Sequence, residues 1–147
     1  GIAPPYHFTE NVSGAAAWLI PAAILCSGMF IHGVATGRLP LVAGWLVGFL
    51  LQALVRSLVA GTSLIAPLAP MTSAAFILFT LYMIPDPATT PIARSRQVVF
   101  GVSVAAVYGA LIAMHLVYGL FLSLFIVCAV RGAALLLMSR LRPVPAV

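Results

Sequence analysis

The chain has 147 residues, of which 63% are hydrophobic and only 6% are charged. Ordinary soluble domains carry roughly 25% charged residues, and at a mean hydropathy of +1.20 a soluble fold would have too little polar surface to face water. The net charge of +5 comes from seven arginines that stand singly rather than in a basic patch, which argues against nucleic acid as a partner. These features predict an all-α integral membrane protein, with a single membrane domain over residues 1–147.

The apolar stretches predict five transmembrane helices. A hydrocarbon core of ~30 Å requires about 20 apolar residues per helix, and the chain divides into such units at its proline, glycine and arginine positions. We predict helices at residues 15–34, 40–59, 70–84, 97–116 and 120–138, the third being short. Residues 61–70, with two prolines, are predicted to form a re-entrant or partly unwound approach to it. The start at Gly1 suggests a fragment of a larger protein or a processed chain.

The arginines at the helix ends predict the orientation. They follow the first, third and fifth helices, at Arg38, Arg94, Arg96, Arg140 and Arg142, whereas the opposite ends carry no cation. By the positive-inside rule, the N-terminus lies outside and the C-terminus lies in the cytoplasm. Five helices leave the two termini on opposite faces, as in one half of an inverted repeat.

A polar run at residues 7–14 precedes the first helix. In a purely structural role, Asn11 or Ser13 would cap the helix by satisfying its free amide donors. In a functional role, the same amides together with Thr9 and Ser13 would hold an anion or the edge of a flavin. The sequence leaves both interpretations open.

Small residues recur every four positions on the second and fourth helices. This spacing lets helix backbones approach closely. It predicts helix packing within the bundle, with homodimerisation or a cofactor lying against the glycines as alternatives. The residues concerned are Gly44, Gly48, Gly101, Ala105, Gly109 and Ala113.

Two arginines lie within predicted spans. Arg56 shares a helix face with Gln52, and Arg131 lies near the middle of the fifth helix, where a lone cation costs ~3 kcal/mol. In a structural interpretation, Arg56 pairs with Glu10 and Arg131 pairs with Asp86. In a functional interpretation, one or both arginines hold an anionic ligand such as a phosphate or an electron-rich ring system.

Between the third and fourth helices lies a rigid polar element, residues 85–91. Its three prolines remove backbone donors and prevent regular helix, and it carries Asp86, Thr89 and Thr90. Sequences at membrane depth avoid such elements unless a cavity or ligand receives them. We therefore expect these three side chains to face a ligand.

The remaining reactive residues predict no metal site and no hydrolase site. Cys26 and Cys128 lie in different apolar segments and are interpreted as inert thiols. His115 and Tyr118, at the outer end of the fourth helix, are typical interfacial anchors, with proton transfer or ring stacking as the alternative. The sequence does not identify a catalytic residue.

Several motifs resemble a known family. Residues 82–91, followed by Arg96 and residues 99–101, resemble the D-P-x-[ST]-[ST]-P segment and the following F-G of the Rnf D membrane proteins of Rnf electron-transport complexes and of their counterparts in sodium-pumping NADH:quinone reductases. The membrane protein of enediyne biosynthesis clusters is more similar still, on residues 8–14, 37–40, 52–56 and 106–109. The likeness covers nearly the whole chain.

The resemblance implies a ten-helix fold of two inverted five-helix repeats, related in architecture to urea transporters, with this chain as the C-terminal half. It implies FMN or riboflavin as cofactor, electron transfer with other redox subunits in the bacterial cytoplasmic membrane, and a place in enediyne-type natural-product biosynthesis. In Rnf D proteins the flavin is attached to a Thr in S-[GS]-A-T. This chain has Ala16 in that place, so covalent attachment is not expected.

These observations lead to one main hypothesis and two alternatives. In the main hypothesis, the chain is a redox membrane subunit in which Asp86, Thr89 and Thr90 hydrogen-bond the polar edge of an isoalloxazine or quinone while the cofactor does the chemistry. The first alternative is a transporter-like or channel-like bundle for a small solute, with Arg131 lining the path. The second is a non-catalytic scaffold that anchors biosynthetic partners in the membrane.

Overall fold

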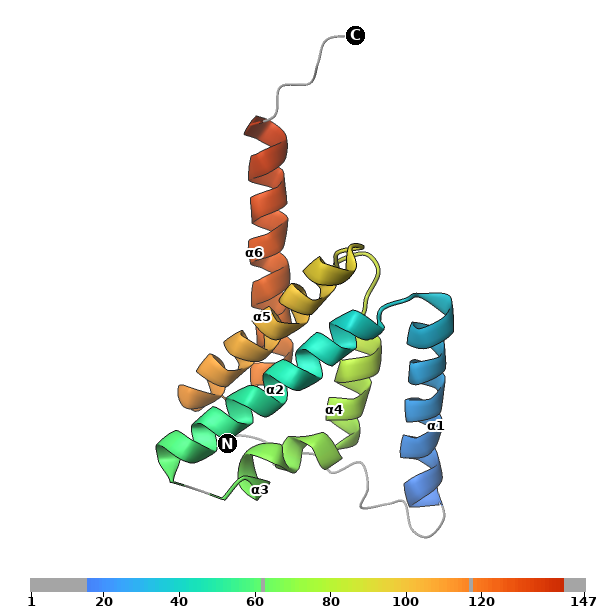
Figure 1. Cartoon of the computed structure of the whole chain (residues 1–147), viewed down its shortest axis with the longest axis vertical. Helices are drawn as coiled ribbons and strands as arrows, with labels where there is room; N and C mark the ends of the chain where they lie inside the picture. Colours follow the sequence, from blue (N-terminus) through green and yellow to red (C-terminus); the bar gives the residue numbers. More distant parts are fainter. Residues whose placement is uncertain (1–15, 62, 117, 142–147) are drawn as a thin grey trace, which may run out of the picture.

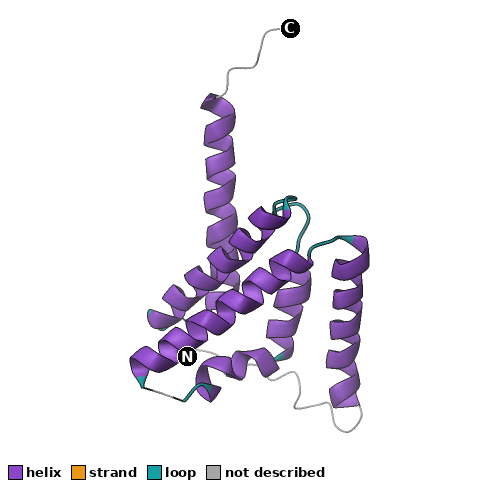
Figure 2. Ribbon diagram, viewed as in Figure 1, coloured by secondary structure: helices purple, strands orange, loops and turns teal. Residues whose placement is uncertain are grey.

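A computed structural model describes residues 16–61, 63–116 and 118–141, and every regular element within these ranges is helical (Figure 2). The prediction of an all-α fold is confirmed for this part of the chain. In chain order, the elements are α1 (Ala16–Phe30), the π-helical turn η1 (Ile31–Ala35), α2 (Leu39–Ala60), α3 (Ile65–Leu68), the 3-10 helix η2 (Ala69–Thr72), α4 (Ala74–Leu78), the π-helical turn η3 (Phe79–Met83), α5 (Arg94–Ala113) and α6 (Gly119–Leu141).

Three helices in the described ranges, α2, α5 and α6, are long and apolar enough to cross a membrane. The pair 65–72 and 74–83, whose two parts meet at a bend of 71°, makes a fourth span if it is counted as one broken helix. Residues 19–35 form a shorter apolar helix. The described structure therefore gives three or four candidate spans where the sequence predicts five, because the third predicted helix is broken and the described apolar part of the first, residues 19–35, is shorter than a span.

The break in the third predicted helix lies at Ser73, not in the approach to it. Ser73 is extended (φ −85°, ψ 141°), and its hydroxyl accepts a hydrogen bond from the Phe76 amide at 3.2 Å, so it caps α4. Residues 65–70, part of the 61–70 stretch expected to be re-entrant or partly unwound, lie in the helical turns of α3 and η2. The prediction of one short helix over 70–84 is thus replaced by two helical pieces joined at a capped corner.

The other predicted helices agree with the structure to within three residues at each end. The largest difference is in α5, which begins at Arg94 after the extended residue Ala93 and ends at Ala113. His115 follows in a tight turn with φ 59°. The sequence predicts that His115 and Tyr118 lie at the end of the fourth helix. In the structure they lie in the α5–α6 connection instead.

Close contact between α2 and α5 forms the centre of the fold (Figure 1). A Cβ atom added at Gly101 would lie 2.5 Å from the Leu41 carbonyl oxygen, and one at Gly44 would lie 2.7 Å from the Val98 carbonyl oxygen. The prediction that the small residues serve helix packing is confirmed here. Further along, Gly48 approaches Ala105 and Gly109 approaches Gln52.

These contacts determine the direction of the chain. Positions increase together along both helices, from Gly44 against Val98 to Gln52 against Gly109, so α2 and α5 run parallel. A parallel pair requires the intervening segment to return along the length of the helices. Residues 65–83 make this return, which fits one broken span better than a re-entrant loop (Figure 1).

An aromatic cluster fills the space between α2, the returning segment and α5. The ring centroids of Trp45 and Phe79 lie 5.4 Å apart, and those of Phe49 and Phe76 lie 4.8 Å apart. The Trp45 indole N–H donates to Thr80 Oγ1 at 3.0 Å, so its polar atom is satisfied away from water. The cluster holds α2 and the returning segment together on one side of the α2–α5 contact.

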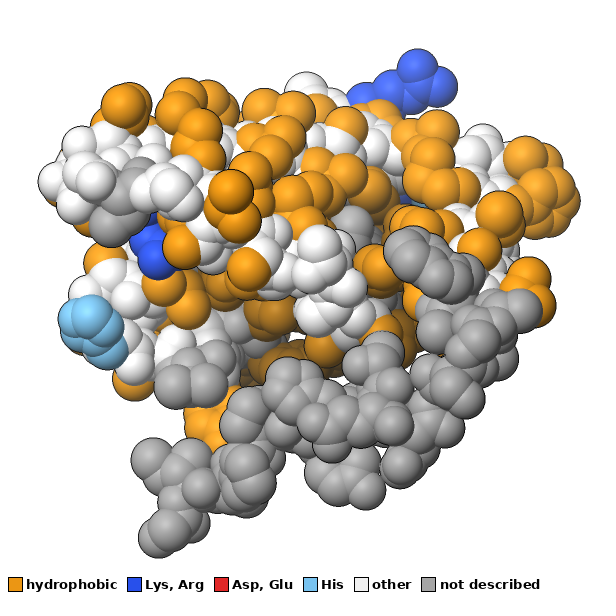
Figure 3. Space-filling model, turned by 90° about the horizontal axis from the view of Figure 1, so that it is seen from below, with side chains coloured by type: hydrophobic (Ala, Val, Ile, Leu, Met, Phe, Trp, Pro, Cys, Tyr) orange, Lys and Arg blue, Asp and Glu red, His pale blue; other side chains and the backbone are white. Residues whose placement is uncertain are grey.

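Helix α6 packs against α5 with its N-terminal part and then extends beyond the other helices (Figure 1). Gly119 and Ser123 in its first turns are buried, whereas Gly132 has no neighbour within 4 Å of an added Cβ. The distal side chains of α6 are largely apolar and exposed. On the face seen in Figure 3, hydrophobic side chains are spread over the described surface and charged ones are few, as expected of a protein in contact with lipid.

Candidate functional site

The loop between η3 and α5 is organised by Asp86. Its carboxylate accepts hydrogen bonds from the Ala88 amide and from the Thr89 hydroxyl, each at 3.2 Å. Its backbone carbonyl accepts from the amide of Thr90 at 3.2 Å and from the Thr90 hydroxyl at 2.5 Å. Asp86 therefore forms an Asx-type turn in its own segment, and part of its acceptor capacity is used there.

Arg38 anchors this loop to the start of α2. The side chains of Arg38 and Thr90 are 7% and 4% exposed, and the Arg38 guanidinium donates to the Thr90 hydroxyl. The sequence indicates Arg38 only as a charge that sets orientation, although Gly37-Arg38-Leu39-Pro40 is one of the motifs that carry the family resemblance. Thr90, predicted to meet a ligand, uses its hydroxyl as a donor and as an acceptor within the protein.

Arg131 joins α6 to the same loop. Its Nη1 donates to the Thr89 carbonyl oxygen at 2.6 Å. The predicted alternative of an ion pair between Arg131 and Asp86 is not what the structure has, because the Asp86 carboxylate is turned toward Ala88 and Thr89. One Nη1 bond leaves most of the five guanidinium donors available for another partner.

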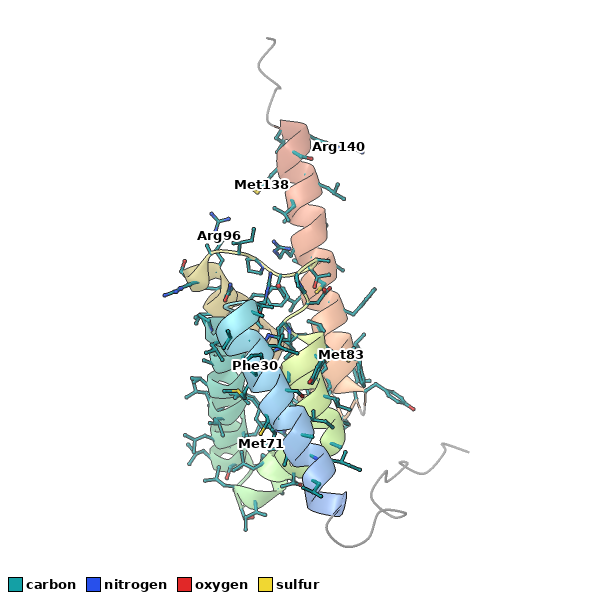
Figure 4. The ribbon with its side chains drawn as sticks, turned by 90° about the vertical axis from the view of Figure 1, so that its right-hand side faces the viewer. Phe30, Met71, Met83, Arg96, Met138 and Arg140 are labelled. Atoms are coloured by element: carbon teal, nitrogen blue, oxygen red, sulfur yellow. The ribbon has the colours of Figure 1, made fainter. Side chains whose placement is uncertain are left out.

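A groove of about 620 Å³ lies between α5 and α6 and is bordered by Pro91 of the loop. Its walls are largely apolar and include one aromatic ring, with Arg96 and Arg131 as cations and no acidic residue. Figure 4 shows Arg96 beside the loop that leads into α5. The lining residues are Pro91, Ser95, Arg96, Val99, Phe100, Ser103, Val107, Ile126, Val127, Val130, Arg131, Ala134 and Leu135.

Arg56 lies far from this groove. Arg56 comes 18 positions after Arg38, the residue before α2, which is a rise of ~27 Å along the helix axis. Arg56 lines a different groove, with His115, where α2 and α5 end. The structure therefore brings Asp86, Thr89, Thr90 and Arg131 together and leaves Arg56 at the opposite end of the bundle.

Four residues in the N-terminal predictions, Thr9, Glu10, Asn11 and Ser13, lie outside the described residues. The proposed helix cap, the proposed anion site and the Glu10–Arg56 ion pair therefore stay predictions from the sequence.

Cys26 and Cys128 are free thiols in separate helices.

Sequence reasoning missed a buried histidine near the loop. His32, in the π-helical turn η1, donates from Nε2 to the carbonyl oxygen of Leu81 in the second π-helical turn η3, and its Nδ1 lies 3.1 Å from Thr36 Oγ1. A π-helical turn shifts the backbone hydrogen-bond pattern and is frequent at functional sites. Here the two turns face each other and fix α1 against the returning segment.

One polar side chain inside the α2–α5 contact has no partner. Both amide atoms of Gln52 are buried without a hydrogen bond among the described residues. The amide lies against Gly109, where an added Cβ would come within 3.3 Å of Gln52 Oε1. The absence of a side chain at Gly109 therefore leaves the space that the Gln52 side chain occupies.

The chain was compared with protein-family models, curated proteins and solved structures, and no match was found in any of the three. Function must therefore be argued from the residues and the geometry of the grooves.

Proposed function

We propose that the chain is a membrane-embedded redox subunit of the Rnf D type, which binds a flavin (FMN or riboflavin) or a quinone without covalent attachment in the α5–α6 groove. The observation that carries the proposal is the position of Arg96 and Arg131, the two cations of a largely apolar groove beside the 85–91 loop. Pockets for cofactors are typically 300–1,000 Å³, mostly apolar and furnished with a few polar groups. The groove has this character.

The residues have distinct roles in this proposal. The forked guanidinium donors of Arg96 and Arg131 suit a phosphate or an electron-rich carbonyl edge. The ring of Phe100 and the neighbouring valines suit an aromatic ring system. Arg131 also holds the Thr89 carbonyl, so it fixes the loop at the edge of the groove. The cofactor supplies the uptake and release of electrons, while the chain supplies position and electrostatics.

The hydrogen bonds within the loop give its residues a structural role in place of the cofactor contacts that the sequence predicts. Thr90 acts through Arg38 as a structural residue, and Asp86 and Thr89 hold the turn. In the proposed site, the arginines make the charged contacts to the cofactor, and the loop forms its rim. Asn11 and Ser13 remain candidates from the sequence alone.

The finer features of the fold belong to the same proposal. We propose that the chain forms a five-helix half of a ten-helix inverted repeat, with α1 as the first span and the pair 65–83 as the third. In this arrangement the 85–91 loop and the end of α6 face the cytoplasm of a bacterium, the N-terminus lies outside, and other redox subunits exchange electrons with the bound cofactor. Enediyne-type biosynthesis is the pathway that the sequence resemblance supports.

Transport of a small solute is a second candidate because of the broken helix pair. Discontinuous helices at membrane depth are typical of transporters, where helix ends line a substrate path. The 71° bend between residues 65–72 and 74–83 is such a feature.

Visible absorption of the purified intact protein, before and after titration with FMN, tests the proposal. We expect a yellow, reducible protein. Arg131→Gln and Arg96→Gln should each weaken FMN binding about tenfold or more, because a hydrogen bond to a charged group contributes ~1.5–3 kcal/mol. Arg94→Gln is the matched control, since Arg94 is an exposed arginine at the same end of α5 that does not line the groove.

The alternatives give different results in the same experiment. Colourless protein that binds no FMN and moves a small solute into liposomes would support transport. Colourless protein that moves no solute and binds neither FMN nor an added quinone would support a scaffold. An unchanged flavin load in both groove variants would exclude the α5–α6 groove as the site.

A further inference from the structure

We propose that the second groove, at the opposite end of the bundle, binds one anionic phospholipid through Arg56. This groove has a volume of about 580 Å³ and lies where α2 and α5 end, with Pro67 of α3 at its side. Apart from Arg56 and His115, its walls are apolar. A ligand with one negative group and a long apolar part matches this distribution of side chains.

Arg56 has no counter-charge in the part of the chain that the structure describes. Its side chain is half-buried, and Asp86, the acid within the described ranges, is engaged in its own loop near the start of α2. An arginine within a membrane span normally faces a partner or a polar cavity.

The depth of Arg56 matches the depth of a lipid phosphate. Arg56 lies four residues before Ala60, the last residue of α2, which is ~6 Å along the helix axis. A side chain of this length reaches the membrane interface from that depth. The guanidinium would therefore meet the headgroup, while Val55, Val59 and Ile112 contact an acyl chain.

His115 contributes a second polar side chain to the lining of the groove. Its backbone has φ 59°, a conformation that is uncommon for residues other than glycine. The turn is held by hydrogen bonds from the His115 amide to Ile112 and from the Leu116 amide to Leu111, at 2.9 and 3.0 Å. This turn places the imidazole beside the groove that Arg56 lines.

The proposal is tested on the full chain in an uncharged detergent by counting bound lipids with native mass spectrometry. The probes are phosphatidylglycerol and phosphatidylcholine of the same acyl chains, with inorganic phosphate in a third arm. We expect one site that prefers phosphatidylglycerol by about fivefold, the factor that ~1 kcal/mol per arginine near an anionic lipid surface predicts. Arg56→Gln should remove this preference, whereas Arg94→Gln, at the other end of the bundle, should keep it.

A second variant tests the groove without changing any charge. Ala113 is exposed and lines the groove at the end of α5, so Ala113→Phe should fill it and weaken phosphatidylglycerol binding even if Arg56→Gln fails to fold. Equal binding of the two lipids by the wild type would overturn the proposal. Displacement of the bound lipid by inorganic phosphate as readily as by phosphatidylglycerol would also overturn it. A preference for phosphatidylglycerol that appears only in Glu10→Gln would overturn it too, because Arg56 would then be paired with Glu10 in the wild type. Flavin binding is measured separately, so its absence leaves this test unaffected.

Discussion

Three arginines within or beside the apolar helices meet three different environments. Arg38 is buried and donates to Thr90, Arg131 is half-buried and donates to the Thr89 carbonyl, and Arg56 faces a groove without a described counter-charge. Helical spacing indicates which face an arginine occupies but not what lies opposite that face. The cost of an isolated charge in the membrane therefore marks these residues in the sequence as important without identifying their partners.

The Arg38–Thr90 contact leads to a test at a single residue. Thr90→Val removes a hydroxyl that receives a buried guanidinium, so the free energy of unfolding should fall by about 1.5–3 kcal/mol, the range for hydrogen bonds to charged groups. Thr89→Val is the matched control, because the Thr89 side chain is exposed and should cost well under half as much. Thermal unfolding of the purified variants in detergent gives both values. Equal losses of unfolding free energy in the two variants would mean that the Arg38–Thr90 hydrogen bond does not contribute to stability.

At the scale of the helices, the α2–α5 contact is determined by small residues. Gly44 and Gly48 on α2 and Gly101 on α5 let the two backbones approach closely, and the four-residue spacing predicts this from the sequence. The break at Ser73 was not predicted. The prolines at 67 and 70 predict an interruption in the residues before Ser73, but Pro70 lies in the first turn of η2, where its missing N–H is tolerated.

A larger side chain at Gly101 should separate α2 from α5. Gly101→Ala places a methyl group 2.5 Å from the Leu41 carbonyl oxygen, so we expect a loss of about 1–3 kcal/mol, typical of overpacking. Gly132→Ala on α6 meets no atom within 4 Å and should be neutral or slightly stabilising, since alanine favours helix more than glycine does. Melting temperatures of the two variants, measured side by side, provide the comparison. A Gly101→Ala protein as stable as the wild type would contradict the tight contact.

At the scale of the whole molecule, the parallel course of α2 and α5 determines how the candidate spans are connected. Since both helices run in the same direction, the segment between them must return, and the bent pair 65–83 is the segment that does so. The exposed distal half of α6 lies beyond this core, where lipid or another part of a larger assembly would cover it. Arg131, near the centre of α6, is held by the loop.

The crossing of the bent pair is testable by cysteine accessibility. In a background with Cys26 and Cys128 replaced by serine, we expect Ala93→Cys and Ser139→Cys to react with an impermeant thiol reagent from the cytoplasmic side. Ser63→Cys should react from the opposite side, because α2 and the bent pair each cross once. Reaction of Ser63→Cys and Ala93→Cys from the same side would show that residues 65–83 are re-entrant.

The amino-acid sequence is sufficient to predict that the described chain is helical and apolar, which helices pack closely, and that residues 85–91 interrupt them. These properties follow from composition, from four-residue spacing and from proline chemistry, all of which are local. The tertiary structure alone decided that Arg131 contacts the Thr89 carbonyl and not Asp86, that Arg38 is buried on Thr90, and that Arg56 belongs to a separate groove ~27 Å along α2. These are contacts between residues distant in sequence, and they depend on how the broken helix pair returns the chain between two parallel helices.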